Sequence, residues 1–543
     1  MFVEEGVFMQ ELVLLGDEAL ALGAIHAGLS VAYGYPGTPS TEILEYVLKH
    51  SESTGSPVAS WCTNEKTAYE AALGASFVGR RALVTMKHVG LNVALDPFMN
   101  SALLEINGGV VLAVADDPGM HSSQDEQDSR YLSEFARVIT FEPANQQEAY
   151  DMVGEAFTVS ERFKIPVVVR LVTRLAHSRA VVHVLEPKPQ NPLKKAENTS
   201  GWMLLPAMAK RNWSLLLSRQ KDFKAYAESS PFNFLTRGDT GADYGVITTG
   251  IGRNYFNENK ADLSTVPPHL HIGVYPCPVE KIRDLATQVR RLIVIEEGYP
   301  FVEEKLNGIL PTGVKVEGKM SGLLPLAGEL DPDIVRKALG LPENPGVSLS
   351  GFSLPGRPPQ LCAGCPHKDS FDAITRAVSS YEKSVVTSDI GCYALGALPP
   401  CSAIETIVCM GASIGMARGV REAGFHPVVA TIGDSTFLHS GMTALLDSVV
   451  RNVQITVVIL DNSTVAMTGG QDTMIPSENF VKLLTGIGVS PEHIKVIKPL
   501  KKYTEENAEI IRREIEYPGV SVILSQRECI EHAVKLKKSG GRS

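Results

Sequence analysis

The chain has 543 residues, of which 44% are hydrophobic and 21% are charged, an ordinary globular balance with room for several domain cores. Its formal net charge of −10 offers no basic surface for nucleic acid, and no apolar run approaches the roughly 18 residues of a membrane span. The acidic start lacks the cationic stretch of a secretion signal, so we expect a cytoplasmic protein.

Residues 1–185 alternate between short apolar runs and helical patterns, which is typical of a parallel α/β sheet. In YPGTPSTEI we expect Thr38 to cap a helix with Pro39 at its first position. Glu65 opens another helix with a small-residue face. Buried strands are predicted at 82–86, 109–115 and 165–172, and Lys87 and His88 follow the first of them in a polar turn.

The middle of the chain breaks this pattern. Residues 186–240 are predicted to form a connector with a packed helix, and 241–341 a smaller α/β domain with strands at 244–249, 271–275 and 292–296. A proline- and glycine-rich linker is expected at 342–360.

The last domain, 361–543, contains two apolar runs at 428–432 and 455–460 that flank a helical pattern, which predicts a parallel βαβ unit. The apolar face of that helix is predicted to hold Leu438, Met442, Leu445, Leu446 and Val449. The runs end in Gly433-Asp434-Ser435 and Asp461-Asn462, at the carboxyl ends where such sheets bind ligands.

These two turns have the donors for a magnesium-bound diphosphate. Asp434 supplies a carboxylate, Asn462 an amide oxygen and Thr464 a backbone carbonyl, which are oxygen ligands of the kind that Mg²⁺ prefers. The turn at Gly433–Ser435 opens a helix whose N-terminus can face phosphate. The alternative is two strand-end turns made of ordinary turn-forming residues.

Eight cysteines in a chain of this size do not predict a disulfide framework. Cys362 and Cys365 form a CxxC pair, which indicates a metal or redox site in a reducing compartment. Cys409 is predicted to be a buried small apolar residue. A structural role is expected for Cys62, Cys277 and Cys401.

Seven ordered stretches carry a family resemblance: YPGTPSTEI, NEKTAYEAALGAS, CAGCPH, SDIGCYALG, CMGASIGMARG, GDSTFLHSG and LDNSTVAMTGGQ. They resemble the alpha subunit of indolepyruvate:ferredoxin oxidoreductase, the aryl-pyruvate branch of the thiamine diphosphate-dependent 2-oxoacid:ferredoxin oxidoreductases. The resemblance covers essentially the whole chain and is weakest at 186–240. GDS and DN stand where the general thiamine diphosphate signature has GDG and NN, a variant that this family also uses.

The resemblance implies an α/β fold with two thiamine diphosphate-binding, doubly wound parallel-sheet domains. The pyrimidine-type domain is expected at 1–185 and the diphosphate-type domain at 361–543, with a transketolase-C-terminal-like α/β domain at 241–341 between them. The family's alpha subunit usually continues into a ferredoxin-like domain. This sequence has no C-x₂-C-x₂-C-x₃-C run, so we expect an external ferredoxin or iron–sulfur chain to carry electrons onward.

The resemblance also assigns roles in the pyrimidine-type domain. Glu65 matches the glutamate that hydrogen-bonds the aminopyrimidine ring; the alternative is a first-turn acid that complements a helix dipole. Thr38 matches a threonine that faces cofactor or substrate, although its capping role would suffice as an explanation. Lys87 and His88 match a cofactor-facing loop in which either can serve the carboxylate of a 2-oxoacid; the alternative is a solvated turn.

In the diphosphate-type domain, the resemblance places Gly433, Asp434, Ser435 and Asn462 on the diphosphate and its Mg²⁺. His439 can approach the diphosphate or the reacting centre, and a capping or core histidine is the alternative. A further set matches a turn over the cofactor, where glycine allows close backbone approach: Gly469, Gly470 and Gln471.

The resemblance further implies a four-cysteine site made of Cys362, Cys365, Cys392 and Cys529. Four thiolates suit a [4Fe–4S] cluster, and tetrahedral zinc is the chemical rival. The implied reaction is oxidative decarboxylation of an aryl pyruvate through a thiamine adduct, with single electrons passing through the cluster and the acyl group passing to coenzyme A. A smaller beta subunit should complete a heterodimer.

Two other functions compete with this one. The first is a non-oxidative thiamine diphosphate-dependent 2-oxoacid decarboxylase with a zinc or empty cysteine site. The second is a non-catalytic subunit of a larger complex, which would not bind thiamine diphosphate.

Overall fold

The computed structural model describes residues 10–306, 308–346, 351, 353 and 359–539, and it divides into two compact units between residues 348 and 349. About half of the linker predicted at 342–360, namely residues 347–350, 352 and 354–358, lies outside the described residues. No helix in the described part of the chain is long and apolar enough to cross a membrane.

A seven-stranded sheet forms the centre of the N-terminal unit, in the order β12-β6-β7-β5-β4-β2-β3. Its strands are β2 (Val31–Gly34), β3 (Val58–Trp61), β4 (Ala82–Lys87), β5 (Val110–Asp116), β6 (Thr140–Phe141), β7 (Val167–Val172) and β12 (Val274–Tyr275). Every neighbouring pair is parallel except β12 with β6. The three strands predicted here are confirmed to within two residues, because strands covered on both faces are continuous apolar runs.

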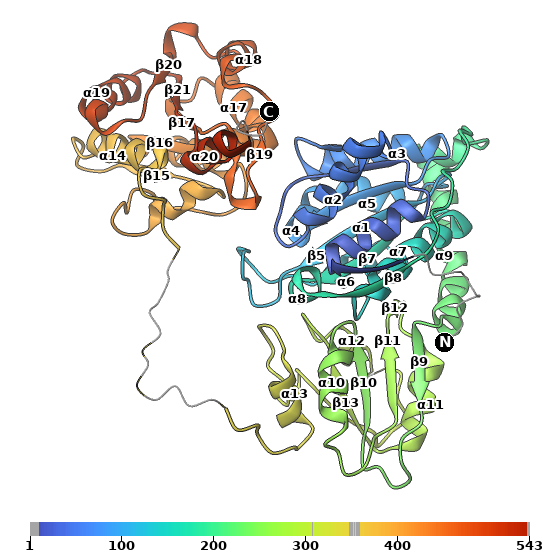
Figure 1. The fold of residues 1–543 in the computed structure, drawn as a ribbon. Coiled ribbons are helices and arrows are strands. Elements are labelled where there is room, and N and C mark those ends of the chain that lie inside the picture. The colour runs from blue at the N-terminus through green and yellow to red at the C-terminus, as the bar shows by residue number, and fades with distance from the viewer. Residues whose placement is uncertain (1–9, 307, 347–350, 352, 354–358, 540–543) are drawn as a thin grey trace. The chain divides into compact units, whose positions relative to one another are not determined.

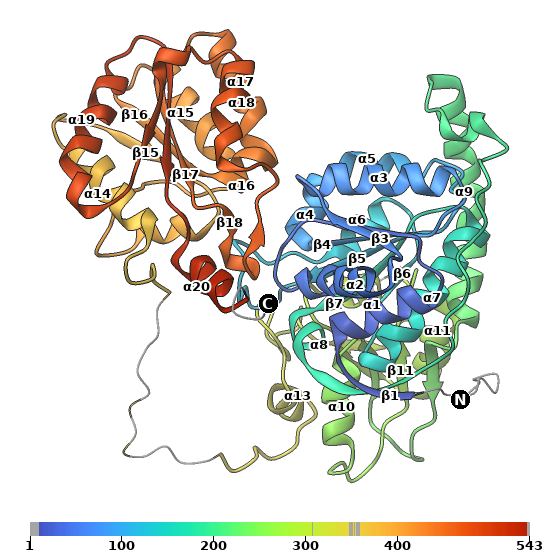
Figure 2. The same ribbon diagram turned by 45° about the horizontal axis from the view of Figure 1, so that its top comes forward.

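Helices cover this sheet: α1 (Gly16–His26), α2 (Thr41–Thr54), α3 (Glu65–Phe77), α4 (His88–Val93), α5 (Leu95–Ser101), α6 (Ser129–Phe135), α7 (Gln146–Phe163) and α8 (Thr173–His177). The strands β1 (Gln10–Leu15) and β8 (Arg179–Val184) form a separate antiparallel pair. Figure 1 shows the long helix α9 (Pro206–Ser229) on the side of the sheet where α7 lies. Phe223 of α9 packs edge-on against Phe163 of α7. The helices α3 and α5 lie side by side (Figure 2), and the Tyr69 hydroxyl is 2.7 Å from Oγ of Ser101.

Two local predictions in this unit are wrong. Helix α2 begins at Thr41 rather than after Thr38, because the Ser40 hydroxyl donates to the Gly37 carbonyl (2.8 Å) and the Gly37 N–H donates to Oγ1 of Thr41 (3.0 Å). Residues 37–40 therefore close into a turn of their own. The polar turn predicted at Lys87 and His88 is also absent: Lys87 ends β4, His88 begins α4, and both side chains are buried.

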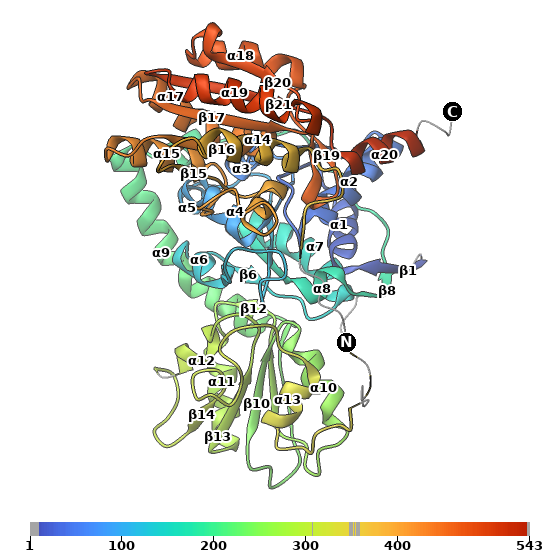
Figure 3. The same cartoon turned by 90° about the vertical axis from the view of Figure 1, so that its left-hand side faces the viewer.

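A second sheet in the same unit has the order β14-β13-β10-β11-β9. Its strands are β9 (Asn233–Thr236), β10 (Gly245–Thr249), β11 (His269–Ile272), β13 (Arg291–Ile295) and β14 (Lys315–Glu317). The helices α11 (Val279–Gln288) and α12 (Phe301–Leu306) pack on one face, and α10 (Gly252–Lys260) and α13 (Pro332–Ala338) on the other (Figure 3).

The strand predicted at 271–275 is divided between the two sheets. Strand β11 ends at Ile272 in the smaller sheet, and β12 joins the larger sheet beside β6. The Asn233 side chain makes this change possible, because its Oδ1 accepts from the N–H groups of Gly273 (2.8 Å) and Val274 (2.9 Å). The two backbone donors at the crossover are thereby satisfied.

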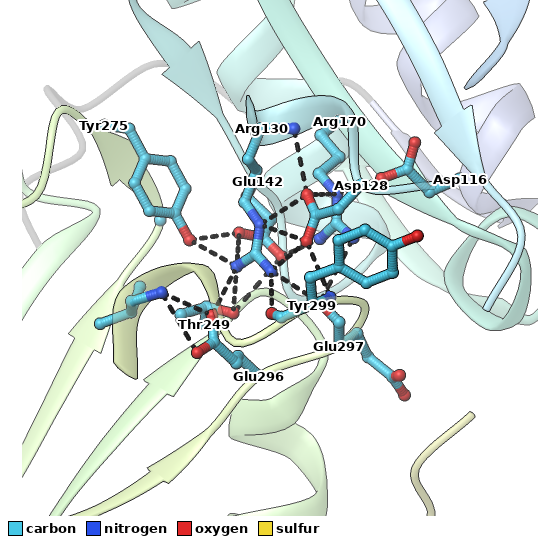
Figure 4. A network of polar contacts seen from close by, with 12 residues as sticks. Asp116, Asp128, Arg130, Glu142, Arg170, Thr249, Tyr275, Glu296, Glu297 and Tyr299 are labelled. Carbon is cyan, nitrogen blue, oxygen red and sulfur yellow. Dashed lines mark hydrogen bonds and ion pairs between the residues drawn. The ribbon is translucent and has the colours of Figure 1, made fainter. Parts of the chain in front are cut away.

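A buried network of ion pairs joins the two sheets (Figure 4). Arg130 of α6 lies 2.5 Å from Oδ2 of Asp128 and 3.1 Å from Oε2 of Glu296, which follows β13. Arg170 of β7 lies 2.6 Å from Asp116 and 2.5 Å from Glu142. Both guanidinium groups are fully buried. Since a buried charge is tolerated only when it is paired, these residues fix the smaller sheet against the larger one.

Replacing one member of this network should weaken the whole N-terminal unit. In Arg130→Met the carboxylates of Asp128 and Glu296 lose their shared cation, and we expect the free energy of opening to fall by about 3–5 kcal/mol. Hydrogen exchange of peptides from β5, β7 and β13 measures this. Arg283→Met, at an exposed ion pair on α11, is the matched control and should change opening by less than about 1 kcal/mol. Equal protection from hydrogen exchange in both variants would contradict the role of Arg130 in joining the two sheets.

The C-terminal unit has a five-stranded parallel sheet in the order β15-β16-β17-β21-β20. The strands are β15 (Val385–Thr387), β16 (Val428–Gly433), β17 (Ile455–Asp461), β20 (Ile494–Ile497) and β21 (Val520–Gln526). Helices α14 (Pro366–Val378) and α19 (Thr504–Ile515) cover one face, and α15 (Ala412–Glu422), α17 (Met442–Val450) and α18 (Phe480–Ile487) cover the other (Figure 2). The predicted parallel βαβ unit is confirmed, as is the α/β fold class.

The helix after β16 differs from its prediction at one position. It consists of α16 (Asp434–Thr436), a single π-turn at Phe437–Gly441, and α17. Leu438 and Leu445 are buried, but Leu446 is 48% exposed. The π-turn adds a residue to one turn, which rotates the following helix and moves Leu446 out of the apolar face.

Candidate functional site

The predicted residues of the N-terminal unit lie at the carboxyl edge of its large sheet. The loop with Thr38 follows β2, Glu65 follows β3, and Lys87 ends β4. Because β3, β2 and β4 are parallel neighbours, their ends meet at one edge. The sheet therefore brings three segments together that are separated in the sequence.

Lys87 is tied to the Thr38 loop through Ser122. Its Nζ donates to the Ser122 carbonyl (2.7 Å), and the Ser122 hydroxyl donates to the Thr38 carbonyl (3.0 Å). Burial lowers the pKa of Lys87 to about 8, against the opposing effect of Asp117 and Asp125. The neighbouring His88 is buried, with Nε2 3.5 Å from Oδ1 of Asp125. Lys87 is thus a poorly solvated cation that a carboxylate ligand can pair with.

Glu65 is the first residue of α3 and is only 6% exposed. Asn64 caps the helix by accepting from the Thr67 N–H (2.9 Å), so the Glu65 side chain is not needed as a cap. Gly90 of α4 lies against it: a β-carbon at that position would come within 2.5 Å of Oε1. The absence of a side chain at Gly90 therefore makes room for the Glu65 carboxylate.

In the C-terminal unit, Asp434 is fully buried at the end of β16. Its two oxygens accept from the N–H groups of Ser435 (2.8 Å) and Ser463 (2.9 Å). The Ser463 N–H also lies 3.2 Å from Oδ1 of Asp461, the last residue of β17. Burial, followed by the Asp461 carboxylate, raises the pKa of Asp434 well above its ordinary value.

Asn462 is held from both sides. Its Oδ1 accepts from the Thr464 N–H (3.3 Å), and its Nδ2 lies 3.2 Å from Nε2 of His367. Burial lowers the pKa of His367 to about 4, so the neutral ring can accept from this amide. Thr464 is buried and begins β18 (Thr464–Val465), which pairs with β19 (Gln471–Asp472).

The remaining predicted residues surround these turns. Gly469 and Gly470 have positive φ values of 127° and 80°, and they bring the Gln471 carbonyl to 3.0 Å from Oγ1 of Thr464. His439 is buried in the π-turn, with Nδ1 2.5 Å from Oγ of Ser440. The glycine turn therefore lies directly against the strand that carries the proposed Thr464 ligand.

The four predicted cysteine ligands lie close enough to affect the pKa values of their neighbours: Cys362, Cys365, Cys392 and Cys529. Burial, and then the neighbouring Cys365, Cys529 and Cys362, raise the pKa of Cys392 to about 12. The Cys529 N–H donates to the Asn462 carbonyl (3.1 Å), which links the fourth cysteine to the Asp461-Asn462 turn. Cys409 is exposed, so its predicted burial is wrong: the next segment packs through Gly411, where a β-carbon would come within 2.6 Å of Cβ of Ser440.

Three contributors to the site are not predicted from the sequence. Asp461 is expected only as part of a turn, yet it faces Asp434; His367 follows the CxxC pair and orients Asn462; Ser122 joins Lys87 to the Thr38 loop. The motif CAGCPH contains His367 and LDNS contains Asp461, so a signal is present for both. Ser122 lies in a polar loop outside these motifs, so the sequence carries no signal for its role.

The residues of the C-terminal unit fit a magnesium-bound diphosphate. The carboxylates of Asp434 and Asp461 lie together in a buried position. Burial and the Asp461 charge raise the pKa of Asp434, and a bound divalent cation would offset the repulsion between the two carboxylates. The Asn462 amide is fixed beside them, and α16 begins at Asp434. Oxygen donors of this kind are the ones that Mg²⁺ shares with phosphate.

Each of the two units contains a segment that matches a known protein family. Residues 22–215 match the family model "Pyruvate flavodoxin/ferredoxin oxidoreductase, thiamine diP-bdg", and 389–524 match "Thiamine pyrophosphate enzyme, C-terminal TPP binding domain". Among solved structures, the chain is similar to 2-oxoglutarate:ferredoxin oxidoreductase from Magnetococcus marinus, with a TM-score of 0.50 and 15% identity over 61% of this chain and 65% of that one. That likeness concerns the fold alone.

Sequence relatives extend over nearly the whole chain. Indolepyruvate oxidoreductase subunit IorA of Archaeoglobus fulgidus is 36% identical over 552 residues, covering 96% of this chain and 86% of the relative. The subunit of the same name from Pyrococcus horikoshii is 34% identical over 577 residues, covering 98% and 88%. The chain is therefore an oxidoreductase that belongs to the family of indolepyruvate:ferredoxin oxidoreductase alpha subunits, with two domains of thiamine diphosphate-binding type.

Proposed function

We propose that this chain catalyses oxidative decarboxylation of an aryl pyruvate. One 2-oxoacid, one coenzyme A and two oxidised ferredoxins would give one aryl-acetyl-CoA, one CO₂, one proton and two reduced ferredoxins. A smaller beta subunit and an external ferredoxin complete the system. The aryl substrate is supported by the name of these relatives, indolepyruvate oxidoreductase.

The observation that carries the redox part is the cysteine group beside the Asp461-Asn462 turn. The thiols of Cys365, Cys529 and Cys362 all raise the pKa of Cys392, so the four cysteines lie near one another. In a [4Fe–4S] cluster each of four thiolates binds its own iron. Such a cluster passes single electrons, which a zinc ion on the same four thiolates cannot do.

Each unit contributes its own residues to the chemistry. Bound thiamine diphosphate supplies a reactive carbon that can attack the keto group of the 2-oxoacid. Asp434, Asn462 and the Thr464 carbonyl would hold the Mg²⁺ of the diphosphate, with Asp461 beside them. His367 holds the Asn462 amide in one orientation. A [4Fe–4S] cluster on the four cysteines would need a reducing, oxygen-poor cytoplasm.

In the N-terminal unit, Glu65 would exchange a proton with the aminopyrimidine ring, since its carboxylate is buried against Gly90 at the start of α3. Lys87 would pair with the substrate carboxylate. Thr38 would face cofactor or substrate from the turn that Ser122 ties to Lys87.

The test is an anaerobic assay of the alpha subunit with its beta subunit, coenzyme A and a viologen dye. We expect reduction of the dye with indolepyruvate or phenylpyruvate to exceed that with pyruvate or 2-oxoglutarate. Cys392→Ser should lose most of the iron and at least 90% of dye reduction. Cys401→Ser is the matched control, because Cys401 lies in the same unit outside the interacting group.

Iron and sulfide analysis separates the alternatives. About four irons and four sulfides per alpha subunit in wild type and in Cys401→Ser support the cluster. Zinc without iron, together with CO₂ release that does not reduce the dye, would replace this proposal with non-oxidative decarboxylation. A preference for 2-oxoglutarate would refute the aryl substrate alone.

A further inference from the structure

Three helix ends meet at a second group of ligand-type side chains in the N-terminal unit. Asp17 lies in the first turn of α1, Glu42 in the first turn of α2, and His177 ends α8. Helix α1 packs against both α2 and α8. None of these residues takes part in the function proposed above.

Asp17 is unusual because it is completely buried. Neither of its carboxylate oxygens has a hydrogen-bond partner among the residues that the structure describes. A buried carboxylate is normally hydrogen-bonded, paired with a cation or bound to a metal. Burial raises the pKa of Asp17 well above its ordinary value, and the carboxylates of Glu42 and Glu18 add to this effect.

The other two side chains are placed to supply ligands. Nε2 of the exposed His177 lies 3.5 Å from Oε2 of the half-buried Glu42. One ligand atom from each of Asp17, Glu42 and His177 lies within 4.8 Å of the other two. Ligands about 2.1 Å from one ion stand up to about 4.2 Å apart, so a small rotamer change would bring all three onto one cation.

We propose that Asp17, Glu42 and His177 bind a divalent transition-metal ion. Carboxylates and water suit Mn²⁺, while imidazole suits zinc, iron and related ions, so the set favours Mn²⁺ or Zn²⁺ over Ca²⁺. Two carboxylates neutralise the ion, and the side of the site at His177 is open to water. Among the described residues, Glu42 raises the pKa of His177, and no group donates a hydrogen bond to the Asp17 carboxylate.

The position of the site predicts what the ion does. It joins the starts of α1 and α2 to the end of α8, and Glu42 lies one position after the Thr41 that closes the turn containing Thr38. An ion would therefore help to hold that turn in place, in addition to its contact with Ser122. Such a structural role does not depend on the reaction that the protein catalyses.

Counting Mn²⁺ tests the proposal, since Mn²⁺ avoids thiols and reports by electron paramagnetic resonance. The full chain is titrated with Mn²⁺ in the presence of excess thiamine diphosphate. We expect Asp17→Asn and His177→Ala each to bind one Mn²⁺ fewer than wild type, or to bind it at least tenfold more weakly. Glu52→Gln, an exposed acid on α2, is the matched control and should keep the wild-type count.

Two results would overturn the proposal. One is a wild-type Mn²⁺ count in both site variants. The other is the lack of an anomalous scattering peak between these side chains in crystals grown with Mn²⁺. The same loss of Mn²⁺ in His177→Ala excludes misfolding as the cause of the loss in Asp17→Asn. The His177 side chain is exposed at a helix end and can be removed with little loss of packing. The number of bound Mn²⁺ ions can be measured on inactive protein, so this test is independent of the oxidoreductase assay.

Discussion

Glu65→Gln should lower kcat for the 2-oxoacid by about 10²–10⁴-fold, the usual contribution of a positioned acid–base group. Glutamine has nearly the same shape and still fits against Gly90, so the fold should be kept. It cannot exchange the proton that the proposed role requires. Steady-state assays of the anaerobic enzyme with its beta subunit measure the loss of activity.

A second readout separates catalysis from structure. The exchange of the C2 hydrogen of bound thiamine diphosphate with D₂O should slow by a factor similar to that for kcat. The affinity for the cofactor should change far less. Glu70→Gln on the exposed face of α3 is the matched control and should match wild type, since its ion pair with Lys66 is at the surface. Exchange at the wild-type rate in Glu65→Gln would refute the assigned role.

Asp434→Asn should weaken magnesium-dependent binding of thiamine diphosphate by at least about 100-fold, or about 2.7 kcal/mol. The variant keeps a side chain of the same size at the end of β16 but removes the charge that would hold the ion. Calorimetric titration with the cofactor and Mg²⁺ measures the change. Asp447→Asn is the matched control, because this exposed carboxylate of α17 pairs with Arg418 of α15 at the surface.

The same variant should have the opposite effect on stability. The folded-state pKa of Asp434 is raised, so the folded protein binds more protons than the unfolded chain between its ordinary pKa of 3.8 and the raised value. Stability is therefore lost as pH rises through that window, and a neutral Asn removes this loss. Without ligands, Asp434→Asn should melt at the same temperature as wild type or higher, while the thermal shift with cofactor and Mg²⁺ disappears. A lower melting temperature together with normal binding would refute the site.

Local patterns explain why much of the architecture could be predicted. The apolar runs at 428–432 and 455–460 became neighbouring parallel strands because a strand buried on both faces has a continuous apolar sequence. Asp434 and Asn462 were placed at one edge of the sheet for the same reason. Predictions failed where a single local contact changed the geometry, as in the turn at 37–40 and the π-turn that exposes Leu446.

The sequence by itself therefore determined the α/β class, the order of strands and turns, and the motifs that identify the family, because these depend on residues close together in the chain. The tertiary structure alone decided which distant side chains meet: Asp461 with Asp434, His367 with Asn462, Arg130 with Glu296, and Asp17 with Glu42 and His177. Burial and pKa depend on the charges and solvent around a group in space. Such surroundings are assembled only when helices and strands pack, so no local pattern in the sequence reports them.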